Sequence, residues 1–261
     1  MMKISLVIPC TPYHFCNSLA EVLKSYENGT VVPDEVVVSL SEARKVKKNS
    51  LNKEASQYLN RCASNGVFKE FKILSHSTKQ THGPNRQAGS MAATGDIIIY
   101  GDADDIPHPQ RVEAIKYCFE KTDAMQVSHW WCHEKCQFTS FDLRDIDEHM
   151  IPYSEVNEKM IDPFDHPNYP RVGYGDVFGR THGGNTAVRR DAIKDIRWKD
   201  WHELRGAPAE DWLFCYEVAH KYKKSIILPI DLIKYSGGAA DLLWENLQWR
   251  GNGSNKSIGA K

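Results

Sequence analysis

The sequence predicts an α/β fold with a largely parallel sheet and helices on both faces. Two observations lead to this prediction. Strand and helix patterns alternate at a regular pace through the first 121 residues. The run Val36–Val38 is continuously apolar, as in strands that are covered on both faces. Ligands of such sheets bind at the carboxyl ends of the strands, so functional residues are expected in the loops that follow the strands.

Each element of the first half is predicted from its own pattern. Apolar, β-rich runs indicate strands, and apolar residues three or four positions apart indicate helices. Pro84 is typical of a helix start, because its missing N–H costs nothing in the first turn, and Gly95 follows the end of that helix. The predicted strands are 3–8, 34–40, 68–74 and 96–100, and the predicted helices are 17–26 (with Ser18 as cap), 51–63, 84–94 and 109–121.

The pattern changes after Thr122. Strands are predicted at 125–132 and 225–228, and helices at 191–196 and 211–222. The stretch from about 142 to 184 is rich in Pro, Asp, Tyr and Gly, and loops of this length are usually functional. We therefore expect one domain over residues 1–250, with a nucleotide-binding type of half at 1–121 and a loop-rich half at 122–250. The residues 251–261 read as a flexible tail.

Composition excludes several classes of protein. The 261 residues carry 33 Lys and Arg against 34 Asp and Glu, so the net charge of −1 gives no bulk attraction to nucleic acid. No run approaches the roughly 20 apolar residues of a membrane-spanning helix. The 7 cysteines show no framework spacing, which favours free thiols in a reducing compartment and predicts a cytoplasmic protein.

An acidic loop directly follows the apolar strand at 96–100. Asp102, Asp104 and Asp105 lie in the segment Gly101–Pro107. Three carboxylates at the end of a buried strand repel one another unless a cation neutralises them. A hard divalent ion with oxygen ligands fits this need. The alternative is an acidic loop that only caps the following helix.

A second pair of carboxylates opens the predicted helix at 211–222. Asp211 is a candidate general base, with Glu210 beside it, and Trp212 offers an aromatic surface on which a sugar could stack. The alternative is electrostatic, because carboxylates at a helix N-terminus are favoured by the helix dipole.

Paired glycines form the third feature, in the segment Thr181–Asn185. Gly183 and Gly184 let the backbone approach a ligand closely, and His182 could bind a metal ion or a phosphate. The alternative is a tight turn that enters a strand.

Taken together, these motifs resemble family 2 glycosyltransferases of the GT-A fold. The resemblance covers about residues 3–235. The segments that carry it are Ile4–Pro9, Gly83–Ala88, Ala93–Asp105 and Glu210–Trp212.

The resemblance implies an inverting transferase that uses a nucleotide-diphosphate sugar, here a UDP-sugar, with Mn²⁺ or Mg²⁺ and a glycan or other hydroxyl acceptor. It implies Asp211 as general base, with Glu210 orienting a sugar. Asp104 would coordinate the metal ion on the diphosphate. Asp102 would help to hold the metal ion through its water shell or would face the ribose of the donor. Arg86 would neutralise phosphate or pair with the acidic loop. The remaining donor-site positions that the motifs mark are Pro9, Cys10, Thr11, Asn85, Ala103, Gly183, Gly184 and Trp212.

Two positions depart from the family pattern. Where an acidic residue usually follows the second strand to read the base, this chain has Ser39–Glu42, so Glu42 is the candidate substitute. Where a late histidine often binds the metal ion, this chain has Tyr235–Gly238, and His182 or water is expected to take that role.

Three alternatives were weighed. A nucleotidyltransferase would need a glycine-rich basic first loop, and Pro9–Phe15 lacks glycine, lysine and arginine. A binding module without turnover would not need Asp102, Asp104 and Asp211 together. A zinc site within His129–Cys136 is disfavoured, because no second ligand pair follows at a suitable distance in the sequence.

Overall fold

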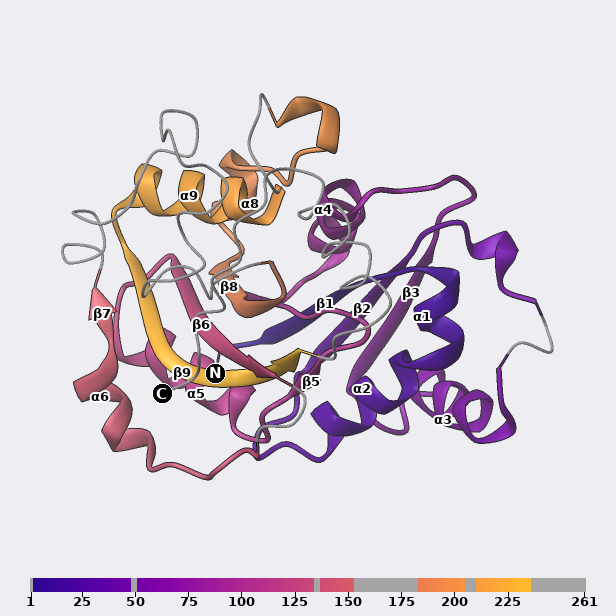
Figure 1. Cartoon of the computed structure of the whole chain (residues 1–261), viewed down its shortest axis with the longest axis horizontal. Helices are drawn as coiled ribbons and strands as arrows, with labels where there is room; N and C mark the ends of the chain where they lie inside the picture. Colours follow the sequence, from indigo (N-terminus) through magenta and orange to yellow (C-terminus); the bar gives the residue numbers. More distant parts are fainter. Residues whose placement is uncertain (1, 48–50, 134–136, 153–182, 205–209, 236–261) are drawn as a thin grey trace, which may run out of the picture.

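The computed structural model describes residues 2–47, 51–133, 137–152, 183–204 and 210–235. These residues form a nine-stranded sheet with helices on both faces (Figure 1). The strand order is β3-β2-β1-β4-β8-β6-β9-β5, and β7 pairs with β9. The predicted α/β fold is therefore confirmed.

The bounds of most elements lie close to the predicted ones. The strands are β1 Ile4–Cys10, β2 Glu35–Leu40, β3 Glu70–Ser75, β4 Ile97–Tyr100, β5 Ile106–Pro107, β6 Gln126–His133, β7 Ile151–Pro152, β8 Thr186–Arg189 and β9 Ser225–Tyr235. The helices are α1 Pro12–Asn17, α2 Leu19–Glu27, α3 Lys53–Ala63, α4 His82–Ala92, α5 Arg111–Lys121, α6 Ile146–His149, α8 Ala192–Asp195 and α9 Glu210–Tyr222. Short 3₁₀ turns are η1 Ala43–Lys45, η2 Leu143–Asp145, η3 Gly183–Asn185 and η4 Trp201–Glu203.

Most strands of the sheet run in one direction. β1 pairs in parallel with β2 and β4, β2 pairs in parallel with β3, and β6 pairs in parallel with β9. β8 enters antiparallel between β4 and β6, and β5 and β7 run antiparallel to β9. The η3 turn and β8 agree with the alternative interpretation of Thr181–Asn185, a tight turn that enters a strand. The four residues of β8 are themselves too few to show a clear alternation.

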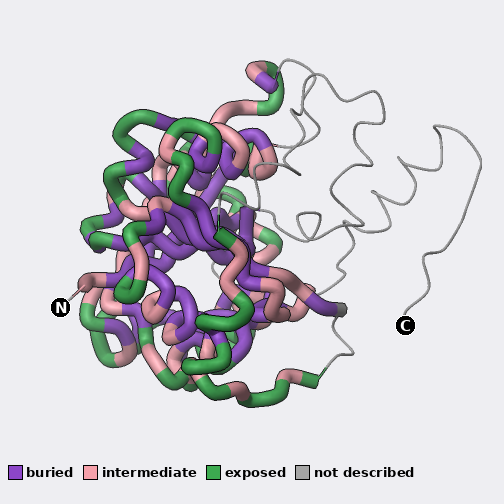
Figure 2. The backbone as a smooth tube through the Cα atoms, turned by 90° about the vertical axis from the view of Figure 1, so that its left-hand side faces the viewer, coloured by how far each residue is buried: buried purple, intermediate pink, exposed green. Residues whose placement is uncertain are grey.

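Alternate residues of the central strands build two separate cores. Leu6 and Ile8 face the core that includes α2, α3 and α5, whereas Val7 faces the core that includes α8 and α9. The buried stretches run through the middle of the chain trace, with the exposed stretches outside them (Figure 2). The continuously apolar strands are therefore covered on both faces, as the run Val36–Val38 predicts.

Two local details differ from the prediction. The helix predicted at 17–26 is α2, but Ser18 makes no side-chain capping bond, and the short helix α1 before it was not predicted. The Ser18 hydroxyl instead donates to the carbonyl oxygen of Ala103 at 2.7 Å, so a tertiary contact replaces the cap. α4 begins at His82, two residues before Pro84, with Thr81 at the capping position.

Within the described ranges, no helix is long and apolar enough to cross a bilayer. The six cysteines found there are all free thiols, as expected from their spacing. The flexible tail expected at 251–261 lies outside the described residues.

Candidate active site

The candidate site lies at the edge of the sheet where β1 and β4 end. The loop that follows β4 carries Asp102 and Asp104. α4 follows β3, so its N-terminus lies at this same carboxyl edge. α9 brings Glu210 and Asp211 to the same place, although they are more than 100 positions away from Asp102 in the sequence.

The buried side chain of Arg86 lies at the centre of the site. Its guanidinium donates to Asp102 Oδ1 at 2.8 Å and to Glu210 Oε1 at 2.8 Å. It also lies over the ring of buried Trp198, 5.1 Å from the ring centroid. Of the two roles considered for Arg86, the structure shows the pairing with the acidic loop. This pairing is charge-assisted and largely removed from solvent, which makes it strong.

The two glycines of η3 pack directly against these charged groups. The Gly183 N–H donates to Asp211 Oδ2 at 3.0 Å. A Cβ on Gly183 would lie 2.7 Å from Arg86 Cζ, and a Cβ on Gly184 would lie 2.4 Å from Asp102 Oδ2. Both positions therefore require glycine, because the backbone approaches the charged side chains more closely than any Cβ allows.

Arg111, which the sequence analysis did not identify, connects the end of β4 with the η3 turn. It is fully buried and donates to the carbonyl oxygens of Tyr100 at 2.6 Å and Gly184 at 2.7 Å. Its Nε donates to His129 Nε2 at 2.9 Å. One side chain thus ties the end of β4 to η3. A signal was present, since an arginine occupies the apolar face of the helix beside Ile115.

Negative charge exceeds positive charge at this edge, and the pKa values reflect it. Burial and the charge of Asp102 raise the pKa of Asp104, whose carboxylate lies 3.5 Å from His14 Nε2. Burial and the charge of Asp211 raise the pKa of Glu210. Burial alone would lower the pKa of Arg86, but the neighbouring carboxylates raise it. A further cation would relieve this repulsion.

The acidic loop fits a divalent metal ion in its chemistry, although the described residues supply only part of a coordination shell. Asp102 and Asp104 offer hard oxygen ligands, and their mutual repulsion is what such an ion would neutralise. Among residues whose positions are described, no group of three or more His, Cys, Asp or Glu side chains is arranged to hold a metal ion. His182 lies outside the described residues. Water and phosphate oxygens are common ligands at such open sites.

The end of β1 forms the neighbouring part of the site. Cys10 is buried, and its carbonyl accepts from Asn85 Nδ2 at 3.4 Å and from the Ser41 N–H at 2.9 Å. Burial and the charge of Asp104 raise the pKa of the Cys10 thiol, so the group is neutral. Pro9 lies opposite Ser39, one pair before β1 and β2 end at Cys10 and Leu40. Thr11 caps α1 through a bond from the His14 N–H at 3.2 Å.

Glu42 follows β2 at the same edge but is engaged locally. Its φ of 47° lies in the left-handed region, which is uncommon for a residue with a side chain. Its carboxylate pairs with Lys45 at 2.6 Å. Glu42 could therefore bind the nucleotide base only by giving up its ion pair with Lys45.

The remaining predicted residues lie around this centre. The backbone N–H of Trp212 donates to Asp211 Oδ1 at 2.7 Å, and its side chain is half-buried. Ala103 is buried and receives the Ser18 hydroxyl. The structure adds His82, whose Nδ1 lies 3.8 Å from Glu210 Oε1, and the sequence alone gave no sign of it.

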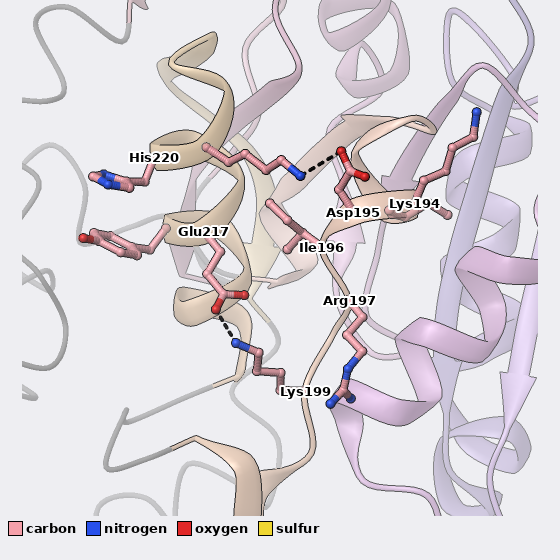
Figure 3. Close-up of a pocket in the computed structure, with 10 residues that line it drawn as sticks. Lys194, Asp195, Ile196, Arg197, Lys199, Glu217 and His220 are labelled. Carbon is pink, nitrogen blue, oxygen red and sulfur yellow. Dashed lines mark hydrogen bonds and ion pairs between the residues drawn. The ribbon is translucent and has the colours of Figure 1, made fainter.

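A groove of about 510 Å³ lies away from these residues, between α9 and α8 with the segment that follows it (Figure 3). Two ion pairs lie within its lining: Lys221 contacts Asp195 at 2.8 Å, and Lys199 contacts Glu217. None of the predicted site residues lines it. The groove is therefore not the candidate active site.

Comparison with known proteins gives the class of this chain, the glycosyltransferases, and its family. The model of glycosyl transferase family 2 matches residues 5–197. The chain belongs to this family. A search of curated protein sequences found no match.

Solved structures show the same fold at low sequence identity. S. aureus TarS 1–349 is 15% identical with a TM-score of 0.59, and the match covers 90% of this chain and 61% of that one. Glucosyl-3-phosphoglycerate synthase from Mycobacterium tuberculosis, in complex with Mn²⁺, UDP and its product, is 14% identical with a TM-score of 0.55 and coverages of 93% and 75%. The mannosyltransferase PcManGT from Pyrobaculum calidifontis, with GDP-Man and Mn²⁺, is 14% identical with a TM-score of 0.53 and coverages of 98% and 66%. The chain spans about three-fifths of the TarS structure.

Proposed function

We propose that this chain is a metal-dependent inverting glycosyltransferase that moves a sugar from a UDP-sugar to a hydroxyl group of a glycan or another acceptor. The observation that carries the proposal is the surplus of carboxylates around Arg86 at the carboxyl edge of a family 2 sheet. Structural neighbours in complex with UDP-GlcNAc, or with Mn²⁺ and UDP, support the choice of donor and ion.

In this proposal Asp104 and Asp102 hold Mn²⁺ or Mg²⁺. When bound, the ion would stabilise negative charge on the departing diphosphate. Pro9, Cys10, Thr11, Asn85 and Glu42 line the nucleotide side, together with Ala103. Arg86 acts by keeping Asp102 and Glu210 in place.

Asp211 is the proposed general base. The acceptor oxygen attacks the anomeric carbon from the side opposite the diphosphate, the bond to the diphosphate breaks, and Asp211 takes the hydroxyl proton. Two backbone groups hold this carboxylate, since the Gly183 N–H reaches Oδ2 and the Trp212 N–H reaches Oδ1. A base that is fixed in this way loses little entropy when the acceptor binds.

The two halves of the proposed single domain divide the substrates. Residues 1–121 carry the donor-side groups. Residues 122–250 carry the acceptor side, with Glu210 orienting a sugar. This half also supplies three of the proposed donor-site residues, Gly183, Gly184 and Trp212. His182 remains a proposed metal ligand or phosphate contact.

The test is the release of nucleoside diphosphate from a panel of nucleotide sugars, with and without Mn²⁺. Transferases that leak slowly to water reveal their donor without a known acceptor. Metal-dependent release from one donor is the expected result. Silence across the panel, with no nucleotide binding in a thermal-shift assay, would instead favour a binding module without turnover.

A further inference from the structure

An exposed tryptophan stands beside the proposed active site. Trp201 opens the η4 turn and is 65% exposed. Large aromatic side chains gain free energy when they are covered, so a tryptophan held this far out of the core is poised to contact something else.

The turn that carries Trp201 is held by several bonds, so the exposure is built into the structure. The carboxylate of Asp200 accepts from the Trp201 N–H at 2.7 Å, and Glu203 reaches back to the Asp200 N–H at 2.9 Å, completing a capping box. Arg197 donates to Glu203 Oε2 at 3.1 Å. The arginine comes from the segment that lines the groove of Figure 3.

The turn docks on the N-terminal end of α4, which lies at the carboxyl edge of the sheet. The Thr81 hydroxyl donates to Asp200 Oδ1. A Cβ on Gly83 would lie 1.8 Å from the carbonyl oxygen of Lys199, so the two backbones are in direct contact. Between these positions, His82 reaches Glu210. Trp201 is thus joined to Glu210 through a short chain of contacts.

The surroundings of Trp201 suit a sugar better than a membrane or a protein. Among the described residues the other exposed large apolar side chains are Tyr13, Val32, Ile73 and Met91, and each comes from a different element or loop. A membrane or protein surface would need a continuous apolar patch. The chain neighbours of Trp201, Asp200 and His202, are polar instead. His202, and His82 at the helix end on which the turn docks, are each more than 70% exposed. One flat ring among hydrogen-bonding groups matches a pyranose, which has an apolar C–H face and hydroxyls around its rim.

We propose that Trp201 is the stacking platform for the acceptor, and that the acceptor is a pyranoside. The assignment to the acceptor side rests on the proposed function and on the link from His82 to Glu210. The other exposed aromatic residue, Tyr13, adjoins His14 and therefore lies on the side of Asp104. The C–H face of the sugar would cover the indole of Trp201, and its hydroxyl groups would form hydrogen bonds with the imidazoles of His82 and His202.

The experiment uses the whole chain with UDP and Mn²⁺ and a panel of methyl glycosides of glucose, galactose, mannose and N-acetylglucosamine. The indole N–H signals are recorded by NMR, and Trp201→Phe assigns the signal of Trp201. We expect one glycoside to shift this signal. Trp201→Ala should weaken its binding about tenfold, whereas Trp201→Phe should bind within about threefold of the original chain. Met91→Ala, which removes an equally exposed apolar side chain from the far end of α4, is the control and should change nothing.

Two results would overturn the proposal. One is that no glycoside moves the Trp201 signal, or that Trp201→Ala binds glycosides as the original chain does. The other is that Trp201→Ala loses only affinity for phosphatidylglycerol vesicles, which would make the residue a membrane contact. Nucleotide-sugar hydrolysis is measured on the same samples. Silence there, with glycoside binding at Trp201 intact, would overturn the transferase but leave a pyranoside site at Trp201.

Discussion

Buried charge is gathered at both edges of the same sheet, and the two clusters differ in kind. At the amino edge, the fully buried carboxylate of Glu35 accepts from the Ser5 hydroxyl, from Lys72 Nζ at 2.5 Å and from the Thr94 N–H at 2.7 Å. Burial alone would raise the pKa of Glu35, but these hydrogen bonds lower it to about 2.

The cluster at the carboxyl edge has the opposite balance. Arg86 is shared by Asp102 and Glu210 and also feels the charge of Asp211. The pKa values of Asp104 and Glu210 are raised by burial and by neighbouring carboxylates. At the amino edge the hydrogen bonds and ion pair of Glu35 therefore stabilise the fold. At the carboxyl edge the carboxylates repel one another, and a bound cation would relieve this repulsion. Such perturbed groups are typical of functional sites.

The largest expected effect concerns the carboxyl edge. Asp211→Asn should lower kcat for nucleotide-sugar hydrolysis by about 10²–10⁴-fold, because the proposed proton acceptor is lost. Donor affinity, measured by calorimetry, should stay within about threefold of the original. Glu217→Gln makes the same chemical change on the groove side of α9 and should leave turnover unaltered. Near-normal turnover of Asp211→Asn would assign the base to another residue.

The second-largest expected effect concerns stability, when the central cation Arg86 is removed. Arg86→Met empties the buried position of the guanidinium and leaves the partly buried carboxylates of Asp102 and Glu210 without their shared partner, so we expect the free energy of unfolding to fall by about 3–5 kcal/mol. Urea denaturation measures this change. Arg144→Met removes an exposed ion pair with Asp142 and should barely move the midpoint. A loss below about 1 kcal/mol for Arg86→Met would mean that the carboxylates find other neutralisation.

At the amino edge, the ionisation of Glu35 should make the free energy of unfolding depend on pH. The pKa of Glu35 is about 2 in the folded chain against 4.5 for a free glutamate, so ionised Glu35 adds about 3 kcal/mol. Because the folded pKa is the lower one, this stability is present above pH 4.5 and is lost as the pH falls from 4.5 towards 2. The gap in unfolding free energy between the original chain and Glu35→Gln should therefore narrow over that range. A gap that does not change with pH would contradict this account.

The smallest expected effect is on nucleotide affinity and concerns Asp104 of the acidic loop. Asp104→Asn should weaken Mn²⁺-dependent UDP binding on the order of a hundredfold, since it removes a proposed metal ligand. UDP binding without Mn²⁺ should be nearly unchanged, as calorimetry can show. Unaltered UDP affinity in Mn²⁺ would sink the metal assignment for Asp104.

Much of the first half could be read from local patterns. Val36–Val38 and the strand before Gly101 are continuously apolar because both of their faces are covered. The helix around Leu59 repeats its apolar residues every three or four positions because one of its faces is buried. Placing Asp102 and Asp104 at the ligand-binding edge needed no more than this, since the loop after a parallel strand lies at that edge.

The partners within the site were decided by the tertiary structure. Arg86 was left with two possible roles, and its pairing with Glu210 joins residues 124 positions apart. The contacts of Arg111 with Gly184, and of Asp200 with Thr81, span 73 and 119 positions. The sequence determined which faces are buried and where charged loops fall, because these depend on neighbours along the chain. Which charged side chains pair with one another depended on how the whole chain folds, with β8 between β4 and β6 in the sheet. Hydrogen bonds join groups that are close in space, so they leave no period in the sequence.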